Sequence, residues 1–221
     1  MAAARRRPQA PARDDSSYER VDEPVLEDDV EWMECLIEGA SLAGTAAQQV
    51  RLVDIRLRTV DLRDAELPHL DARDCLIVDS DLANATCANA VLTWVELAET
   101  RATGLDLAES TLLHVTFRDC KLDLAAFRFA KLTDVELRDC VLTGADLTGA
   151  ELTRVTFLRC DLTGADLSSA RLDSVDLRSC TLESLRGVGA LRGATLDATQ
   201  ILALAPSLAA ELGIVVVNDE P

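Results

Sequence analysis

Apolar residues recur at every fifth position along most of this sequence. Steps of five from Leu52 to Leu182 visit 27 positions, of which twenty are leucine and none is charged. A second uncharged row lies two residues before each of these centres and consists mainly of Ala, Val, Cys, Ser and Thr. The register extends upstream in weaker form through Ile37 and Leu42. All 39 charged residues between positions 50 and 185 therefore fall on the other three positions of the repeat.

A period of five matches neither the 3.6 residues of a helix nor the two of a strand. A short extended segment followed by a turn satisfies it, with two side chains in five directed inward. Four such segments close a square coil of twenty residues, and like residues recur at that interval. The inward columns are Cys120, Cys140, Cys160 and Cys180; Val95, Val115, Val135, Val155 and Val175; Ala125, Ala145 and Ala165; and Ala130, Ala150 and Ala170. The pattern predicts an all-β solenoid whose coils stack at about 4.8 Å.

The two ends of the chain depart from the repeat. Residues 1–34 begin with Arg5, Arg6 and Arg7, continue into an acidic stretch, and hold few apolar residues, which predicts a disordered tail. The repeats occupy 35–185, and residues 186–221 are predicted to form a helical cap, because an open coil would expose backbone and core.

The cap region contains the usual signals for helix ends. Asp197 or Thr199 is expected to begin a helix, Pro206 to break or restart it, and Gly213 to end it. Ile214–Val217 form a candidate final strand.

Charge and composition narrow the classes of function. The 39 acidic and 22 basic residues give a net charge of −17, which argues against direct nucleic-acid binding and favours a basic partner or simple solubility. No stretch approaches the ~18–20 apolar residues of a membrane span. Residues 1–30 contain no signal-peptide core, so a cytoplasmic location is expected.

The repeat motif resembles that of the pentapeptide-repeat family, A(D/N)LXX. ADLTG at Ala145–Gly149 and ADLSS at Ala165–Ser169 match it best, and the resemblance covers about 35–185. It implies a right-handed quadrilateral β-helix. The C-terminal region resembles the C-terminal helix of the quinolone-resistance members, which dimerise through that end. That resemblance implies a homodimer through Ile201, Leu204, Leu208 and Leu212, with a monomeric cap as the alternative.

No pattern for catalysis, a metal or a cofactor emerges. The four column cysteines are too far apart in sequence for zinc knuckles and are better interpreted as buried, reduced, small apolar residues. His69 and His114 fall on outward positions, and Asp134 lies one coil above His114 as a possible ion-pair partner. We therefore expect no enzyme, no metal and no cofactor.

The outward charges are unevenly distributed among the four faces of the predicted coil. The face centred on Leu62 carries six acids and three bases, and the next, centred on Leu67, carries five acids and one base, Arg128. The other two faces are close to neutral. Leu124, Ala126 and Phe129 form an apolar island within the acidic side. The predicted partner-binding residues are Asp61, Asp64, Glu66, Asp81, Asp106, Glu109, Asp123, Asp146, Asp161, Asp166 and Phe129.

Two functional hypotheses follow. The quinolone-resistance members act as DNA mimics on type II topoisomerases, and the uninterrupted register here resembles their loopless mycobacterial form. The resemblance thus implies an acidic rod that binds DNA gyrase. Its net charge of −9 between positions 50 and 185 is under half of the ~21 charges on an equal length of B-DNA, but seven of the nine lie on two faces. The alternative is a scaffold with an unrelated partner, in which acidity serves solubility.

Overall fold

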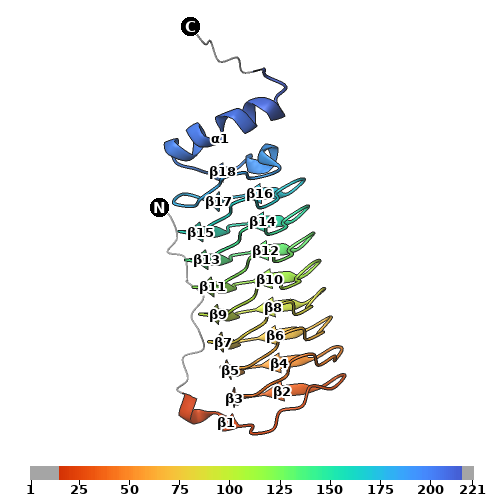
Figure 1. Ribbon diagram of the computed structural model, residues 1–221. Helices are drawn as coiled ribbons and strands as arrows, with labels where there is room; N and C mark the ends of the chain where they lie inside the picture. Colours follow the sequence, from red (N-terminus) through yellow and green to blue (C-terminus); the bar gives the residue numbers. More distant parts are fainter. Residues whose placement is uncertain (1–14, 216–221) are drawn as a thin grey trace.

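The chain winds into a parallel β-solenoid closed at its C-terminal end by a helix (Figure 1). This computed structural model describes residues 15–215. The coils of the repeat body contain twenty residues, because their strands pair in register with residues twenty positions later, as Leu112 does with Leu132. The offset is shorter at the two ends, where Glu19 pairs with Cys35 and Val175 pairs with Ala194. The predicted all-β solenoid with a C-terminal helical cap is confirmed.

Two sides of each coil carry continuous parallel sheets, which we call the ladder faces. The first ladder face consists of β2 (Glu31–Met33), β4 (Arg51–Val53), β6 (Asp71–Arg73), β8 (Val91–Thr93), β10 (Thr111–Leu113), β12 (Lys131–Thr133), β14 (Glu151–Thr153) and β16 (Arg171–Asp173). The second consists of β1 (Glu19–Arg20), β3 (Cys35–Glu38), β5 (Arg56–Arg58), β7 (Leu76–Val78), β9 (Glu96–Ala98), β11 (Thr116–Arg118), β13 (Glu136–Arg138), β15 (Thr156–Leu158), β17 (Val175–Asp176) and β18 (Ala194–Thr195).

The other two sides, which we call the turn faces, join coils through single bridges such as Asp61↔Asp81 and Asp146↔Asp166. Each pentapeptide there closes a tight turn: the N–H of Ala145 donates to the carbonyl of Leu142 over 3.0 Å, and Gly144 between them has φ of 67°. A positive φ at the third residue is the mark of a type II turn. The first turn face is centred on Leu62 and its equivalents, and the second on Leu67 and its equivalents.

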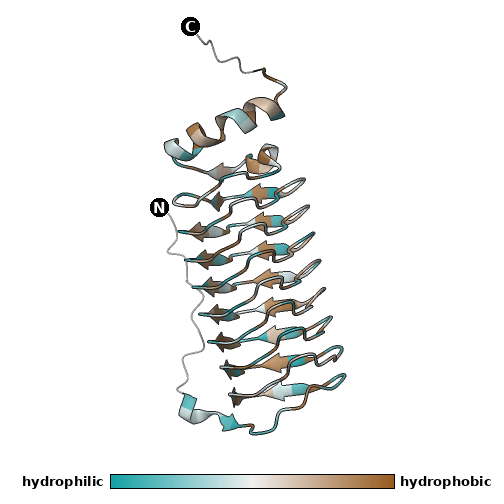
Figure 2. Cartoon of the chain, viewed as in Figure 1, coloured by the Kyte–Doolittle hydropathy of each residue, from teal (hydrophilic) through white to brown (hydrophobic). Residues whose placement is uncertain are grey.

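The interior is filled by the two rows that the sequence assigned to it. All 27 residues of the small row from Val50 to Cys180 are buried, as are 25 of the 27 centres from Leu52 to Leu182. Ile77 and Leu172, the two exceptions, are partly buried against the same core. Hydrophobic residues consequently lie above one another in the strands of successive coils (Figure 2).

The ordered solenoid begins before residue 35, the boundary predicted from sequence. β2 already pairs with β4, and β1 pairs with β3. Tyr18 is buried over Arg56, whose guanidinium carbon lies 5.0 Å from the ring centroid, and its hydroxyl donates to Asp54 at 2.6 Å. The short helix η1 (Asp15–Ser17) supplies Asp15 to Arg58 at 2.6 Å. The sequence pattern missed this N-terminal segment because the segment carries no five-residue period. A few polar contacts hold it against the coils. Residues 1–14 of the predicted tail lie outside the described residues.

The C-terminal end is closed by η2 (Val188–Leu191), β18 and the helix α1 (Ala198–Glu211). Asp197 begins α1 with a capping box, in which it and Gln200 exchange hydrogen bonds of 2.9 Å. Gln200 also donates to the carbonyls of Leu177 and Cys180, each at 2.8 Å, so its amide occupies the place of the next coil's N–H groups.

The helix α1 differs from its prediction at Pro206 and agrees with it at Gly213. Pro206 was expected to interrupt the helix, but α1 runs through it, since Leu204 anchors the helix on the core and one missing N–H is tolerated there. Gly213, with φ of 70°, follows the end of the helix as expected. Of the candidate final strand, Ile214 and Val215 are not in a strand, and residues 216 and 217 lie outside the described residues.

Candidate partner-binding surface

The aspartates on the turn faces have a structural role that the repeat motif conceals. Asp106, Asp146 and Asp166 each accept a hydrogen bond from the backbone N–H two residues later, at 2.9, 2.9 and 2.8 Å. Asp61, Asp81 and Asp161 do the same on the first turn face. An oxygen that satisfies this N–H stabilises the turn, and an asparagine oxygen serves equally well. The preference of the A(D/N)LXX motif for Asp or Asn at this position is thus explained by the hydrogen-bond acceptor, without any need for charge.

The ladder faces and the turn faces differ in how many of their carboxylates are paired with an arginine. Between residues 50 and 185, nine of thirteen carboxylates on the ladder faces have an arginine nitrogen within 4.0 Å. On the turn faces only four of eleven have such a partner among residues 15–215, namely Asp61, Asp81, Asp146 and Asp166. Between residues 50 and 185 the ladder faces carry thirteen acids against eleven bases, so the net negative charge is concentrated on the turn-face side of the rod.

The predicted acidic residues all lie on that side. The balance between acids and bases there differs from the prediction by one base. The last coil extends to Arg186, which bridges Asp166 and places a guanidinium nitrogen 3.4 Å from it. The turn faces thus carry eleven acids against five bases. Six of the predicted residues have no basic nitrogen within 4.0 Å among residues 15–215: Asp64, Glu66, Asp106, Glu109, Asp123 and Asp161.

Two turn-face carboxylates, those of Asp61 and Asp166, have a lowered pKa. Hydrogen bonds from the Arg63 guanidinium lower the pKa of Asp61 to about 2. Hydrogen bonding from Ser168, ahead of the attraction of Arg186, lowers the pKa of Asp166. These two carboxylates therefore keep their negative charge throughout the physiological range.

The apolar island predicted within the acidic side is present. Leu124 is 66% exposed and Phe129 is 60% exposed, and the two stand at opposite edges of the second turn face. Ala126, between them in sequence, bridges Asp106 below and Asp146 above. Apolar side chains and carboxylates thus share one surface.

The residues predicted for dimerisation divide into two groups. Leu204 is 3% exposed and Leu208 is partly buried against the core, so both hold α1 to its own solenoid. This corrects their assignment to a surface for a second subunit. Ile201 and Leu212 are exposed, and a hollow of about 470 Å³ lies beside them, lined also by Val188, Leu191 and Leu196. Leu202, Ile214 and Val215, which were not among the predicted dimerisation residues, extend this exposed apolar end.

The cysteine column forms part of a longer column of hydrogen-bond donors. Cys140 donates from Sγ to the carbonyl of Arg138 at 3.2 Å, as the hydroxyls of Ser80 and Thr100 donate to the carbonyls two residues before them, both at 2.8 Å. Ser80 and Thr100 precede Cys120 at the same twenty-residue interval, which is the signal that could have revealed this role. All seven cysteines are free and buried. Burial raises the pKa of Cys75 and of Cys87 to about 12.

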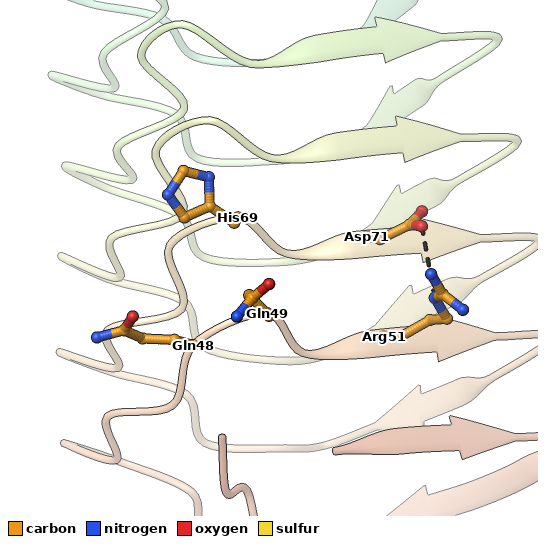
Figure 3. A pocket seen from close by; sticks show the side chains of 5 residues that line it. All are labelled: Gln48, Gln49, Arg51, His69 and Asp71. Atoms are coloured by element: carbon orange, nitrogen blue, oxygen red, sulfur yellow. Dashed lines mark ion pairs between the residues drawn. The ribbon is translucent and has the colours of Figure 1, made fainter. Parts of the chain in front are cut away.

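The two histidines lie outside any arrangement for acid–base chemistry. His114 stacks on Trp94 with ring centroids 4.0 Å apart, and its predicted neighbour Asp134 is held by two 2.7 Å hydrogen bonds from Arg154. His69 lies beside an open polar hollow with Gln48, Gln49, Arg51 and Asp71 (Figure 3). Arg51 and Asp71 are already paired at 3.6 Å. No group of three or more metal-ligating side chains occurs within residues 15–215.

The fold and the surface charges together define the class of protein. It is a β-solenoid whose interior is filled by side chains, with most carboxylates paired with arginine on one side and most of them unpaired with arginine on the other. The pentapeptide repeat region model matches residues 102–167, and the model of eight pentapeptide repeats matches residues 152–183. The two pentapeptide-repeat models together match residues 102–183 of this chain. None of the described helices has the length and hydropathy required to cross a membrane.

The chain is similar to the solved structures of two other proteins. HetL, a pentapeptide repeat protein involved in heterocyst differentiation regulation in the cyanobacterium Nostoc sp. strain PCC 7120, is 22% identical with a TM-score of 0.50, over 76% of this chain and 87% of that one. QnrB1, a plasmid-mediated fluoroquinolone resistance protein, is 20% identical with a TM-score of 0.40, over 84% and 100%. No curated protein matches the chain significantly.

Proposed function

We propose that this protein is a non-enzymatic, acidic rod that binds the basic DNA-binding surface of a type II topoisomerase, DNA gyrase, in the manner of a DNA mimic. It would modulate the enzyme or protect it from quinolone-like inhibitors. The observation that supports this proposal is the charge asymmetry: carboxylates are mostly neutralised on the ladder faces and mostly free of basic partners on the turn faces. The choice of gyrase rests on the resemblance noted in the sequence to the quinolone-resistance members of the family.

The magnitude of the charge is compatible with partial mimicry. Eight strands of the first ladder face stacked at ~4.8 Å span about 34 Å. B-DNA carries about 20 phosphate charges over that length. The turn faces offer eleven carboxylates, all presented to one side, where a basic groove would meet them. The rod would therefore compete with DNA for a groove that contacts one side of the duplex.

A second subunit would extend the acidic surface. We infer that the exposed residues Ile201 and Leu212, with Leu202, form a homodimer contact at the C-terminal end. Two rods joined there would double the length of the charged surface. Size-exclusion chromatography with light scattering tests this: Leu202→Ser with Leu212→Ser is expected to give a monomer, and a monomeric parent protein would contradict the dimer.

A scaffold function with an unrelated partner is the second candidate. The observation that favours it is the hydrogen bonding of six turn-face aspartates to backbone N–H groups, because that role explains their presence without any partner. The two candidates differ in whether the negative charge itself is needed.

A supercoiling assay with purified gyrase, with and without a fluoroquinolone, tests the first candidate. Asp106, Asp146 and Asp166 are replaced together by asparagine, which removes three charges but keeps each oxygen that accepts the backbone hydrogen bond. We expect the inhibition or protection to weaken about tenfold at low salt, since rim charges control association. Salt should also weaken the effect of the parent protein.

The matched control removes three charges from the opposite side of the coil, by Asp119→Asn, Asp139→Asn and Asp176→Asn on the second ladder face. It has the same net charge as the test variant and should act like the parent protein. Equal loss in both variants would show that net charge alone matters. The absence of any effect of the parent protein at micromolar concentration would reject the gyrase proposal.

A further inference from the structure

Leu124 and Phe129 occupy positions that disfavour them on two grounds. Both are more than half exposed, and both have a positive φ, 57° and 56°. The repeat imposes a positive φ at this position in other coils too, as at Asn84 and Asn89, but a bulky side chain is unfavourable there. The other coils carry small or polar residues in the same two columns: Asp64, Asn84, Gly104, Gly144, Gly164 and Ser184 in one, and His69, Asn89, Glu109, Gly149 and Ser169 in the other.

The following coil makes room for both side chains. A Cβ added to Gly144 would lie 2.9 Å from Leu124 Cδ2, and one added to Gly149 would lie 2.5 Å from Phe129 Cδ1. Leu124 and Phe129 therefore lie against backbone that has no side chain of its own. The same combination, a large apolar residue followed one coil later by glycine, occurs in both columns between the same two coils. We call Leu124, Ala126 and Phe129 the corner patch.

Carboxylates surround the corner patch. Asp106 and Asp146 bridge Ala126 from the coils on either side, and Asp123 directly precedes Leu124. Glu109 lies one coil before Phe129 in the same column. Three bases also lie nearby: Arg128, which is 3.7 Å from Asp146, and Lys121 and Lys131 at the two edges of the patch. The four carboxylates outnumber them, so an occupant that is cationic around an apolar centre fits this surface best.

We propose that the corner patch is the anchor of the acidic surface and binds an apolar side chain that a protein partner presents among lysines and arginines. This inference rests on the proposed function and names the contact that gives it specificity. Carboxylates alone attract any basic surface, and salt screens that attraction. Burial of Leu124 and Phe129 would add affinity that salt does not screen, because buried apolar area drives it. Interface energy is commonly concentrated in a few such side chains.

The test replaces Leu124 and Phe129 with asparagine, the residue found at Asn84 and Asn89 in the same columns. Asparagine tolerates a positive φ, so the variant should melt at the same temperature as the parent protein or higher. Binding to purified gyrase is measured by surface plasmon resonance at 50 and 300 mM salt. We expect a loss of affinity of about tenfold or more that is the same at both salt concentrations. The triple Asp→Asn variant should lose affinity mainly at low salt.

Trp94→Asn provides the matched control. Trp94 is also a partly exposed aromatic residue at positive φ, 57°, but it lies at the edge of the first ladder face. Its replacement should leave gyrase binding unchanged, and equal losses in both variants would overturn the proposal.

The remaining outcomes separate the two proposals. If the parent protein binds gyrase and the double variant binds as tightly, the corner patch is not an anchor and the charge-based proposal stands. If the double variant melts at a lower temperature, Leu124 and Phe129 serve to hold the coils together, which also overturns the inference. If the parent protein does not bind, the gyrase proposal and this anchor fail together.

Discussion

The ladder faces and the turn faces are built on one interior but present different exteriors. Inward residues on all four sides follow the same two rows and are almost all buried. Outside, the ladder faces carry three-residue strands with arginine–carboxylate pairs, such as Arg159 on Asp139 one coil away. The turn faces carry single bridges, hydrogen-bonded turns and unneutralised acids. The repeat thus fixes the shape of the rod, while the outward positions are free to differ from side to side.

A charge placed in the interior should be equally damaging behind either kind of face. Leu147 lies behind the second turn face and Leu137 behind the second ladder face, and each is 1% exposed. Leu147→Asp and Leu137→Asp should both cost more than about 4 kcal/mol, because a buried carboxylate there has no partner and no path to water. Urea denaturation followed by circular dichroism measures the loss. Thr148→Asp, at the outward neighbour, should cost little, and a stable Leu147→Asp protein would refute the inward assignment.

Alkaline pH provides a second test that the interior is uniform. Cys75 lies at a ladder-face corner and Cys87 behind a turn face, and burial raises the pKa of both thiols from 9.0 to about 12. The folded state therefore retains these protons where the unfolded state has lost them. Stability should be unaffected below pH 9 and fall between pH 9 and 12, by about 1.4 kcal/mol per pH unit for each thiol.

Urea denaturation at pH 8 and 10.5 measures this dependence. The double variant Cys75→Ala with Cys87→Ala should start from lower stability at pH 8, because it leaves small cavities, but lose less on going to pH 10.5. An unchanged slope in the double variant would show that these thiols are accessible to water in the folded protein.

The sequence was sufficient for the repeat body because the five-residue period is itself the physical cause of the coil. Residues such as Leu112 and Ala145 are buried as that period requires. It was insufficient at the ends, where no period operates. Tyr18 is held by Arg56 and Asp54, which are 38 and 36 residues away, and Leu204 turns inward because α1 lies on the last coil. Such contacts depend on how the chain folds back on itself.

The candidate surface was predicted in outline, because outward position and charge can both be read from the repeat. The ion-pair and hydrogen-bond partners of each carboxylate could not be predicted from the repeat. Arg186 neutralises Asp166 because the last coil extends beyond the fading of the leucine register. The backbone acceptor role of Asp106 became apparent only from the 2.9 Å hydrogen bond to the N–H of Ala108. Charge and hydrogen bonding at one aspartate are separate properties, and only the first is visible in a composition.

The smallest expected effect separates these two properties of the turn-face aspartates. Asp106→Ala removes the acceptor for the Ala108 N–H and should cost about 1 kcal/mol, whereas Asp106→Asn keeps it and should cost much less. Asp71 occupies the same position of the repeat on the first ladder face, where its carboxylate accepts from the Arg73 side chain. Asp71→Ala and Asp71→Asn should therefore be destabilised alike.

Chemical denaturation of the four variants in parallel measures the difference. A gap between alanine and asparagine at position 106 but not at position 71 would establish that turn-face aspartates stabilise the coil through an oxygen and leave their charge free for another role. An equal gap at both positions would instead assign the effect to intrinsic preferences of the two residues. If Asp106→Ala and Asp106→Asn are equally stable, water satisfies the Ala108 N–H as well as the side-chain oxygen does. Hydrogen bonding to the backbone would then not explain why acidic residues are concentrated on the turn faces.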